Sequence, residues 1–352
     1  MSRKSLVIAA FILLTLAGFA AGLGGWMVFG PNTPDYEGTR AVTLPDSTTS
    51  SFPAVVEALE TAGILASATS LRVVARATGW DAQIKPGHYA FESGVSTYQL
   101  LDVLRRGLQT PVRLTIPPGS RPEVVAAVAA RRLQFSRDAF LTAVRDTALA
   151  RSLGVEPGHL FGYLLPETYE FYWQTSADRV IRRVKQAFDR FYARNLAGPA
   201  DSLDLSKKET LTLASIVEWE ALLDDEKSTI AGVYLNRLDR GWKLEADPTI
   251  QYVLIDSLGE RVRRVLYKHL EIEHPYNTYQ VRGLPPGPIT NPAPSTLRAA
   301  VQPAQHDYMY FAADGTGGHT FSRTLREHNR AAQKYHELLD ERERNRQSDD
   351  AN

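Results

Sequence analysis

The first long apolar segment of the chain covers residues 6–28 and has almost no polar interruption. Arg3 and Lys4 precede it, and the polar stretch GPNTPDYEG follows it. About 20 apolar residues cross the core of a bilayer, and flanking basic residues stay on the cytoplasmic side. The pattern predicts a transmembrane helix over 6–28, a cytoplasmic tail over 1–5 and an extracytoplasmic remainder. A cleaved signal peptide is the alternative, because small residues over 17–21 suit a peptidase.

A change of pattern follows the apolar segment. Residues 29–40 contain two prolines, two glycines and two threonines, which is typical of a linker. Residues 41–120 then alternate short apolar strands with helices. The periodicity predicts a strand that leads into a helix over 42–64, a second strand over 87–91 and an amphipathic helix over 97–108. We interpret 41–120 as a small α+β module, which serves either as a spacer or as a glycan-binding module.

Helical periodicity dominates the next part of the chain, and it predicts helices over residues 121–133, 137–149 and 177–196. The aromatic-rich stretch FGYLLPETYEFYW, residues 161–173, interrupts this series and contains Glu167. Its rings either fill a core or form a platform for sugar rings. The expected fold class is therefore α+β, with a mainly helical α+β domain over 121–340 and a disordered tail over 341–352.

One predicted helix carries acids in an apolar context. Residues 211–220, LTLASIVEWE, are apolar on nearly every side but include Glu218 and Glu220. Burial raises the pKa of a carboxyl group, so such an acid stays protonated near neutral pH and can donate a proton to a leaving group. Two residues along a helix are about 200° apart, so the two acids do not form a catalytic pair with each other. A second carboxylate from elsewhere, such as Asp247 or Glu167, remains an open alternative.

Polar residues recur in the segments that follow this helix. Asn236 lies in the apolar helix IAGVYLNRL, and Asp247 precedes Pro248, where it either caps a helix or lines a cleft. The proline-rich and glycine-rich segments over 275–292 predict ordered loops. Directional donors and acceptors on rigid loops suit sugar hydroxyls, although such a loop can also cover an edge strand. The loop candidates are Tyr276, Asn277, Thr278, Tyr279 and Asn291.

Composition narrows the chemistry. Forty basic and forty acidic residues cancel, which gives no indication of nucleic acid as a partner. The chain has no cysteine, so disulfides, thiolate metal sites and cysteine nucleophiles are excluded. The eight histidines lack the spacing of metal ligands, and no phosphate-binding loop or serine elbow is present. We therefore expect no metal and no cofactor.

Six ordered motifs resemble one known family. They are ASIVEWE, VYLNRL, ADPTIQY, YNTY, GLPPGPITNP and GGHTFSRTLREHN, and the first begins at Ala214 while the last ends at Asn329. In order and spacing the chain is similar to the YceG-like family of endolytic murein transglycosylases over 41–340. The resemblance implies an inner-membrane protein with one transmembrane helix, a LysM-like subdomain over 41–120 and a catalytic domain over 121–340.

The resemblance also implies an activity. Family members cut nascent peptidoglycan strands internally, between N-acetylmuramic acid and N-acetylglucosamine, and leave a 1,6-anhydromuramic end. The catalytic acid of the motif falls on Glu218, and Glu220 matches the supporting second acid. The implied partners are peptidoglycan strands, the inner membrane and peptidoglycan synthases, with no nucleic acid.

The chain departs from the family pattern at Trp219, where a lysine is common between the two acids. It also has Ala293 after Pro292, where a glycine is usual. Two other functions remain as alternatives, a hydrolytic muramidase and a non-catalytic glycan-binding scaffold.

Overall fold

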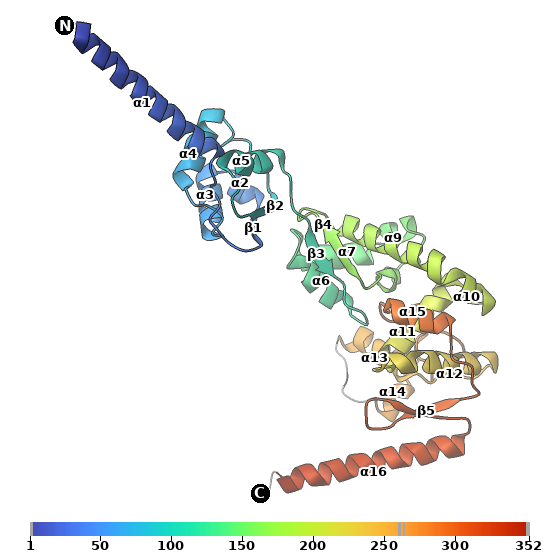
Figure 1. Cartoon of the computed structure of the whole chain (residues 1–352). Helices are drawn as coiled ribbons and strands as arrows, with labels where there is room; N and C mark the ends of the chain where they lie inside the picture. The colour runs from blue at the N-terminus through green and yellow to red at the C-terminus, as the bar shows by residue number, and fades with distance from the viewer. Residues whose placement is uncertain (1–2, 260–261, 263–264, 350–352) are drawn as a thin grey trace. The chain divides into compact units, whose positions relative to one another are not determined.

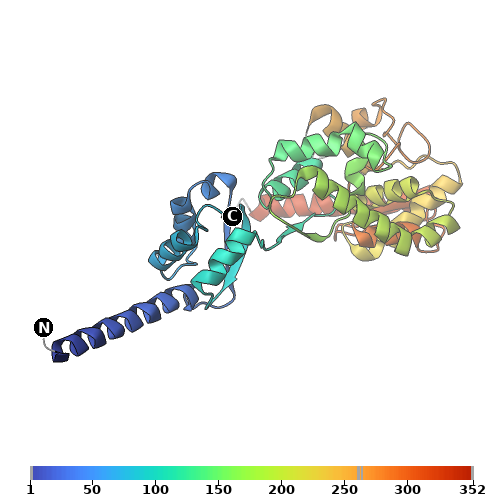
Figure 2. The same cartoon turned by 90° about the horizontal axis from the view of Figure 1, so that it is seen from above.

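The structure is a computed structural model that describes residues 3–259, 262 and 265–349. It divides into two compact units (Figures 1 and 2). The first unit comprises residues 1–113, 132–134 and 170–175, and the second comprises 114–131, 135–169 and 176–352. Both units combine helices with short antiparallel strands, so the predicted α+β class with a mainly helical content is confirmed.

Helix α1, Arg3–Phe29, is the single helix among the described residues that is long and apolar enough to cross a membrane. It has 27 residues, and none of them is buried in the protein. Figure 2 shows it extending away from the rest of the first unit. The helix begins at Arg3, so part of the predicted tail over 1–5 is helical. A single-pass anchor fits this helix, and a signal sequence near the N-terminus can meet the same criteria of length and hydropathy.

The remaining elements of the first unit form the predicted small module. They are β1 (Thr39–Leu44), α2 (Asp46–Thr49), α3 (Phe52–Thr61), α4 (Ala68–Thr78), β2 (Gly87–Glu92) and α5 (Thr97–Arg106). Strands β1 and β2 pair antiparallel from Thr39 opposite Glu92 to Leu44 opposite Gly87. Their inner faces pack on the apolar faces of α3, α4 and α5. Gly107 ends α5 in the left-handed conformation.

The predicted linker over 29–40 is packed against this module. Asn32 and Thr33 are buried. The Asn32 side chain donates to the carbonyl of Ser67 at 3.1 Å and accepts from its N–H at 2.7 Å. The Thr33 hydroxyl donates to the carbonyl of Glu92 at 2.9 Å. The polar composition of this segment predicted a linker, but its side chains complete the hydrogen bonding of backbone groups in the module.

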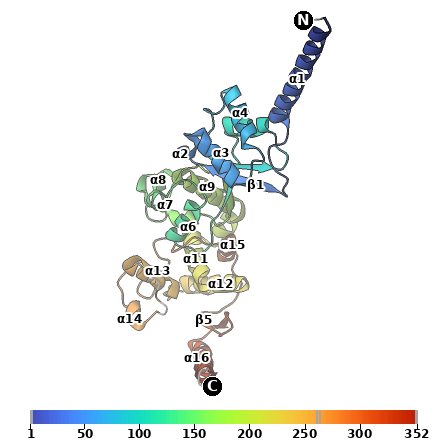
Figure 3. The ribbon, with the colours of Figure 1, turned by 90° about the vertical axis from the view of Figure 1, so that its left-hand side faces the viewer.

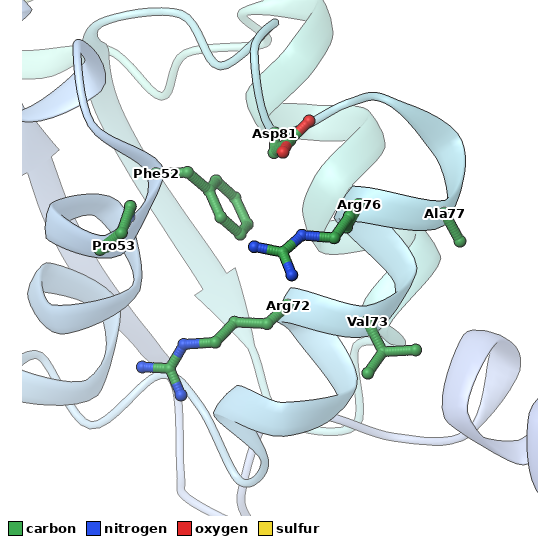
Figure 4. Close-up of a pocket in the computed structure, with 7 residues that line it drawn as sticks. All are labelled: Phe52, Pro53, Arg72, Val73, Arg76, Ala77 and Asp81. Atoms are coloured by element: carbon green, nitrogen blue, oxygen red, sulfur yellow. The ribbon is translucent and has the colours of Figure 1, made fainter.

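The first unit contains a cavity of about 500 Å³ between the start of α3 and the exposed face of α4 (Figure 4). The side chains of Arg72 and Arg76 extend from α4 toward Phe52 and Pro53. Arg72 also forms a 3.7 Å ion pair with Glu60 at the surface. The cavity is confined to the first unit, whereas the acidic helix belongs to the second unit.

The second unit is mainly helical, and the chain enters it within β3 (Val112–Thr115), which pairs with β4 (Thr168–Phe171). Its earlier helices are α6 (Pro122–Ala130), α7 (Arg137–Arg145), α8 (Thr147–Ser152), η1 (Leu160–Tyr163), α9 (Ala177–Asn195), α10 (Ala197–Ser202) and α11 (Lys207–Glu220). Its later elements are η2 (Asp224–Glu226), α12 (Lys227–Asp239), α13 (Asp247–Leu258), α14 (Tyr267–Leu270), α15 (Pro294–Val301), β5 (Tyr310–Ala313), β6 (His319–Ser322) and α16 (Leu325–Asp349).

Two predictions for this part of the chain need correction. The helix predicted over 137–149 is two helices, because the Asp146 side chain accepts hydrogen bonds from the N–H groups of Ala148 and Leu149 and so caps α8. The second unit begins at Leu114, whereas the predicted catalytic domain begins at residue 121, and that domain division stays a prediction. Residues 341–349, expected to be disordered, continue α16, while 350–352 lie outside the described residues.

The aromatic-rich stretch over 161–173 belongs mainly to the core. Phe161, Tyr163, Tyr169 and Phe171 are buried, and the Tyr163 ring meets Phe188 edge to face with centroids 5.2 Å apart. Of the two interpretations drawn from the sequence, the structure favours the core over a sugar platform.

Candidate active site

Helix α11 is the centre of the second unit. It packs against α12, α13 and α15, and Figures 1 and 3 show it beside α12 and α15. Ser206 begins the helix in a capping box, in which its hydroxyl accepts from the Glu209 N–H and the Glu209 carboxylate accepts from the Ser206 N–H. Residues 210–217 are all buried. The cap and the buried turns therefore fix the direction in which the last turn presents Glu218 and Glu220.

The last turn is an unfavourable position for acids, because the helix dipole places partial negative charge there. The structure supplies compensating groups to each acid separately. Glu218 lies against α15 and Lys227, whereas Glu220 lies against Tyr234 on α12. The prediction that the two acids face different directions is therefore confirmed.

The Glu218 side chain is 9% exposed, and one of its oxygens is held firmly. Oε2 accepts a hydrogen bond from the Ala293 N–H at 3.0 Å and another from the Thr296 hydroxyl. Lys227 Nζ lies 3.7 Å from the same oxygen and 2.6 Å from Asp224 Oδ1, with its side chain only 8% exposed. All these contacts go to Oε2, which leaves Oε1 as the oxygen available for chemistry.

Gly119 occupies the position next to Oε1. A Cβ built on this glycine would lie 3.6 Å from Glu218 Oε1, and its φ of +59° is one that other residues rarely adopt. Asn291 holds the loop between β3 and α6, here called the Gly119 loop. Its backbone carbonyl accepts from the Gly119 N–H and its side chain accepts from the Ser120 N–H, both at 2.9 Å. The loop thus approaches the carboxyl closely without placing a side chain in front of it.

Glu220 belongs to a second polar cluster. The Tyr234 hydroxyl donates to Glu220 Oε2 at 3.2 Å, and the Tyr279 hydroxyl donates to Asp247 Oδ1 at 2.7 Å. Burial, reinforced by the nearby Asp247 charge, raises the pKa of Glu220 to about 7, against smaller opposing effects of Tyr234 and Arg237. Glu220 therefore fits the expectation of a buried carboxyl with a raised pKa on this helix. The structure brings together three residues predicted from the sequence, Glu220, Asp247 and Tyr279.

The raised pKa of Glu220 predicts a pH-dependent stability. The folded state binds the proton up to about pH 7, whereas the unfolded state releases it near 4.5, so stability falls as pH rises between these values. We expect roughly 2–3 kcal/mol from this group. Melting temperatures at pH 5, 6, 7 and 8 should therefore fall about 4–8 °C more in the wild type than in Glu220→Gln.

Asp247→Asn is the control for this pH dependence. It removes the neighbouring charge but leaves the burial, so it should weaken the effect without abolishing it. Equal melting profiles for the wild type and Glu220→Gln across this pH range would show that Glu220 titrates as it does in the unfolded chain.

Most of the remaining predicted site residues serve the loops themselves. The Asn277 amide donates to the carbonyls of Leu270 and Ile272, and Thr278 bonds to the N–H of Ala246. Both side chains are buried, as is that of Asn291. Their donors and acceptors are used within the protein, so we infer that they shape the loops rather than bind a ligand.

Three further candidates also lie apart from Glu218. The Asn236 amide donates to the carbonyls of His306 and Tyr308, and the buried Tyr276 hydroxyl is 3.1 Å from His159 Nε2. Glu167 is exposed at the start of β4. None of the contacts described for these three side chains reaches Glu218. In the described part of the chain, no three His, Asp or Glu side chains gather as a metal site.

Sequence reasoning missed Lys227, Thr296 and Gly119. Lysines and threonines on helices are usually surface residues, and no spacing marks these two as partners of Glu218.

The GGHTF motif, residues 317–321, has a structural role. His319 Nδ1 lies 2.8 Å from Glu226 Oε2, and the backbone N–H of His319 donates to Glu226 Oε1 at 2.7 Å. These contacts connect β6 to the residue before Lys227.

A cavity of about 560 Å³ lies in the same unit. Trp219, which stands between the two acids in the sequence, contributes to its wall together with Phe161 and Tyr252. The Trp219 indole N–H donates to the carbonyl of Gly119 at 2.8 Å. Neither Glu218 nor Glu220 lines the cavity, but Gly119 is bonded to Trp219 and lies beside Glu218.

The chain is similar to several known proteins. An endolytic murein transglycosylase of Bacillus subtilis is 30% identical, with 89% of this chain and 91% of the relative aligned. One of Streptococcus pneumoniae is 28% identical, and the alignment covers 90% of this chain and 62% of that relative. The crystal structure of a YceG-like protein from Listeria monocytogenes, 29% identical, superimposes with a TM-score of 0.58 and covers 84% of this chain and 99% of that one. The model of the YceG-like family matches residues 45–334, and the chain therefore belongs to the YceG-like family.

Proposed function

We propose that this chain is an endolytic murein transglycosylase in which Glu218 is the catalytic acid and base. The observation that carries the proposal is the asymmetric environment of its carboxyl, with Oε2 held by Ala293, Thr296 and Lys227 and Oε1 left for a proton. The names of the two bacterial relatives support the activity.

The reaction needs one carboxyl that acts twice. Protonated Glu218 donates to the glycosidic oxygen between N-acetylmuramic acid and N-acetylglucosamine, and the bond from that oxygen to the muramoyl C1 breaks. The resulting carboxylate takes the proton of the muramoyl C6 hydroxyl as its oxygen bonds to C1. The products are a 1,6-anhydromuramic end and a free N-acetylglucosamine hydroxyl, and no water is consumed.

The partners of Oε2 suit this sequence of steps. A carboxylate forms when Glu218 gives up its proton, and a buried ammonium, a hydroxyl and a backbone N–H stabilise that charge without rearrangement. The same three groups orient the carboxyl so that the proton is carried on the oxygen beside Gly119.

A hydrolytic muramidase is the alternative, and it needs a second carboxylate about 5 to 9.5 Å from the first. Asp247 is bonded to Tyr279 in the Glu220 cluster, and Glu167 is exposed outside the contacts of Glu218. These positions count against Asp247 and Glu167 as the second carboxylate. Asp224 shares Lys227 with Glu218 and is close enough to be one, so the chemistry of the new strand ends decides between the C6 hydroxyl and water as the nucleophile.

We also propose how the chain is organised in the cell. Helix α1 is a single-pass anchor in the bacterial cytoplasmic membrane, with Arg3 and Lys4 on the cytoplasmic side and the two units on the other side. The first unit after α1 is the LysM-like subdomain, which is consistent with its small α+β architecture. The proposed partners are peptidoglycan strands and, for assembly, peptidoglycan synthases.

The cutting pattern tests the proposed activity. The full chain in detergent should convert long uncrosslinked glycan strands into fragments of many lengths from the start of the reaction, because an endolytic enzyme cuts internal bonds. Size-exclusion chromatography of early time points measures this distribution. Disaccharides released alone from the strand ends would contradict an endolytic activity, and unchanged strands that still bind the protein would favour a scaffold.

A further inference from the structure

The cavity beside α11 has no role in the proton transfers described above. Its volume of about 560 Å³ is within the range of small-molecule sites. Three aromatic residues, Trp219, Phe161 and Tyr252, contribute to its wall together with two isoleucines, Ile255 and Ile289. A partly apolar cavity of this size suits a ring-shaped ligand with an apolar face.

Trp219 is held in place rather than free to rotate. Its indole N–H is bonded to the carbonyl of Gly119 at 2.8 Å, and this bond fixes the plane of the ring. A Cβ on Gly119 would lie 3.6 Å from Trp219 Cδ1 and 3.6 Å from Glu218 Oε1. One loop residue therefore lies beside both the carboxyl and the indole, so the cavity begins near the catalytic group.

The charged residues at the cavity balance one another. Arg121 and Arg145 lie at its wall together with Glu123 and Asp256, and Arg145 pairs with Glu123 at 3.2 Å. Equal numbers of cations and anions give no preference for a charged ligand. They do provide many hydrogen-bond donors and acceptors, which hydroxyl and acetamido groups require.

We propose that this cavity is a subsite for one uncharged N-acetylhexosamine residue of the glycan strand, with a face of its ring against Trp219. The inference rests on the proposed function, because it takes the glycan strand as the ligand. It identifies Trp219, which lies between the two acids in the sequence, as a substrate-binding residue of this chain. The subsite holds the strand so that the neighbouring glycosidic bond reaches Glu218.

The binding test uses the full chain in detergent with Glu218→Gln, so that cleavage does not interfere, and the N-acetylglucosamine tetramer as the probe. Adding Trp219→Ala should weaken the Kd measured by calorimetry roughly tenfold, while Trp219→Phe, which keeps a ring, should weaken it about twofold to threefold. Ile255→Trp should also weaken binding, because it fills the cavity but leaves Trp219 in place. Tyr172→Ala, which removes an exposed ring of the first unit, is the matched control and should leave the Kd unchanged.

Kinetics separate binding from a merely structural effect of Trp219. With Glu218 intact, Trp219→Ala should raise the KM for strands about tenfold and change kcat by less than about threefold. A lower kcat with unchanged Kd and KM would mean that Trp219 only anchors the Gly119 loop, and it would overturn the proposal. Unchanged affinity in both Trp219→Ala and Ile255→Trp would overturn it as well. Tetramer binding that depends on Trp219 in a protein that cuts no strands would support the subsite while rejecting the proposed activity.

Discussion

Replacement of Glu218 by Gln should lower kcat for strand cleavage by about 10³-fold or more and leave strand affinity within about threefold. Gln has nearly the same shape, and its amide oxygen accepts the hydrogen bonds from the Ala293 N–H and the Thr296 hydroxyl. It carries no proton that it can donate to a glycosidic oxygen. Single-turnover cleavage of uncrosslinked strands measures the loss, and binding of the same strands measures what remains.

Glu220→Gln is the matched control for this experiment. It makes the same chemical change two residues later on α11, in a cluster whose contacts do not include Glu218. We expect its kcat to stay within about tenfold of the wild type. The assignment would be wrong if Glu218→Gln kept wild-type turnover, or if Glu220→Gln lost as much activity as Glu218→Gln.

Lys227→Met should lower kcat by about 10- to 100-fold, which is the second largest effect that the structure predicts. The Lys227 ammonium is buried 3.7 Å from Glu218 Oε2, so its charge stabilises the carboxylate that forms when the proton leaves. Removing a buried partner of a charged group typically costs 3–5 kcal/mol, and part of that cost falls on the transition state. Met has a similar length but no charge.

Two further variants show whether charge or packing is responsible. Lys227→Arg keeps the positive charge and should recover most of the turnover lost in Lys227→Met. Asp224→Asn removes the other anionic partner of Lys227 without touching Glu218, and it should leave kcat within about threefold. Equal losses in Lys227→Met and Lys227→Arg, together with lowered melting temperatures, would indicate that Lys227 acts only through packing.

Local patterns predicted much of the fold. The apolar segment over 6–28 became α1, the amphipathic pattern over 97–108 became α5, and the acidic helix was placed correctly. These features depend on neighbours in the sequence, which periodicity and capping preferences describe well. The break at Asp146 was missed, because its side chain competes with the backbone of a helix that periodicity alone would continue.

The partners of Glu218 were not predictable in the same way. Gly119 and Thr296 are about a hundred and eighty residues apart in the chain and meet only in the folded second unit. The structure also shows how polar loop residues such as Asn291 are used within the protein. Their composition suits sugar binding, but they are buried and hold loops together. Composition describes what a side chain can bond to, whereas only the fold decides which partner it has.

The central claim is that a single carboxyl, Glu218, carries out both proton transfers and that the muramoyl C6 hydroxyl is the nucleophile. Mass spectrometry of the new strand ends tests it most directly, because a hydrolysed end contains one more water than an anhydro end. We expect the full chain to yield internal fragments that end in 1,6-anhydromuramic acid, and Glu218→Gln to yield none. Reducing muramic ends, with the mass of one added water, would contradict the account and would require a second carboxylate that activates water.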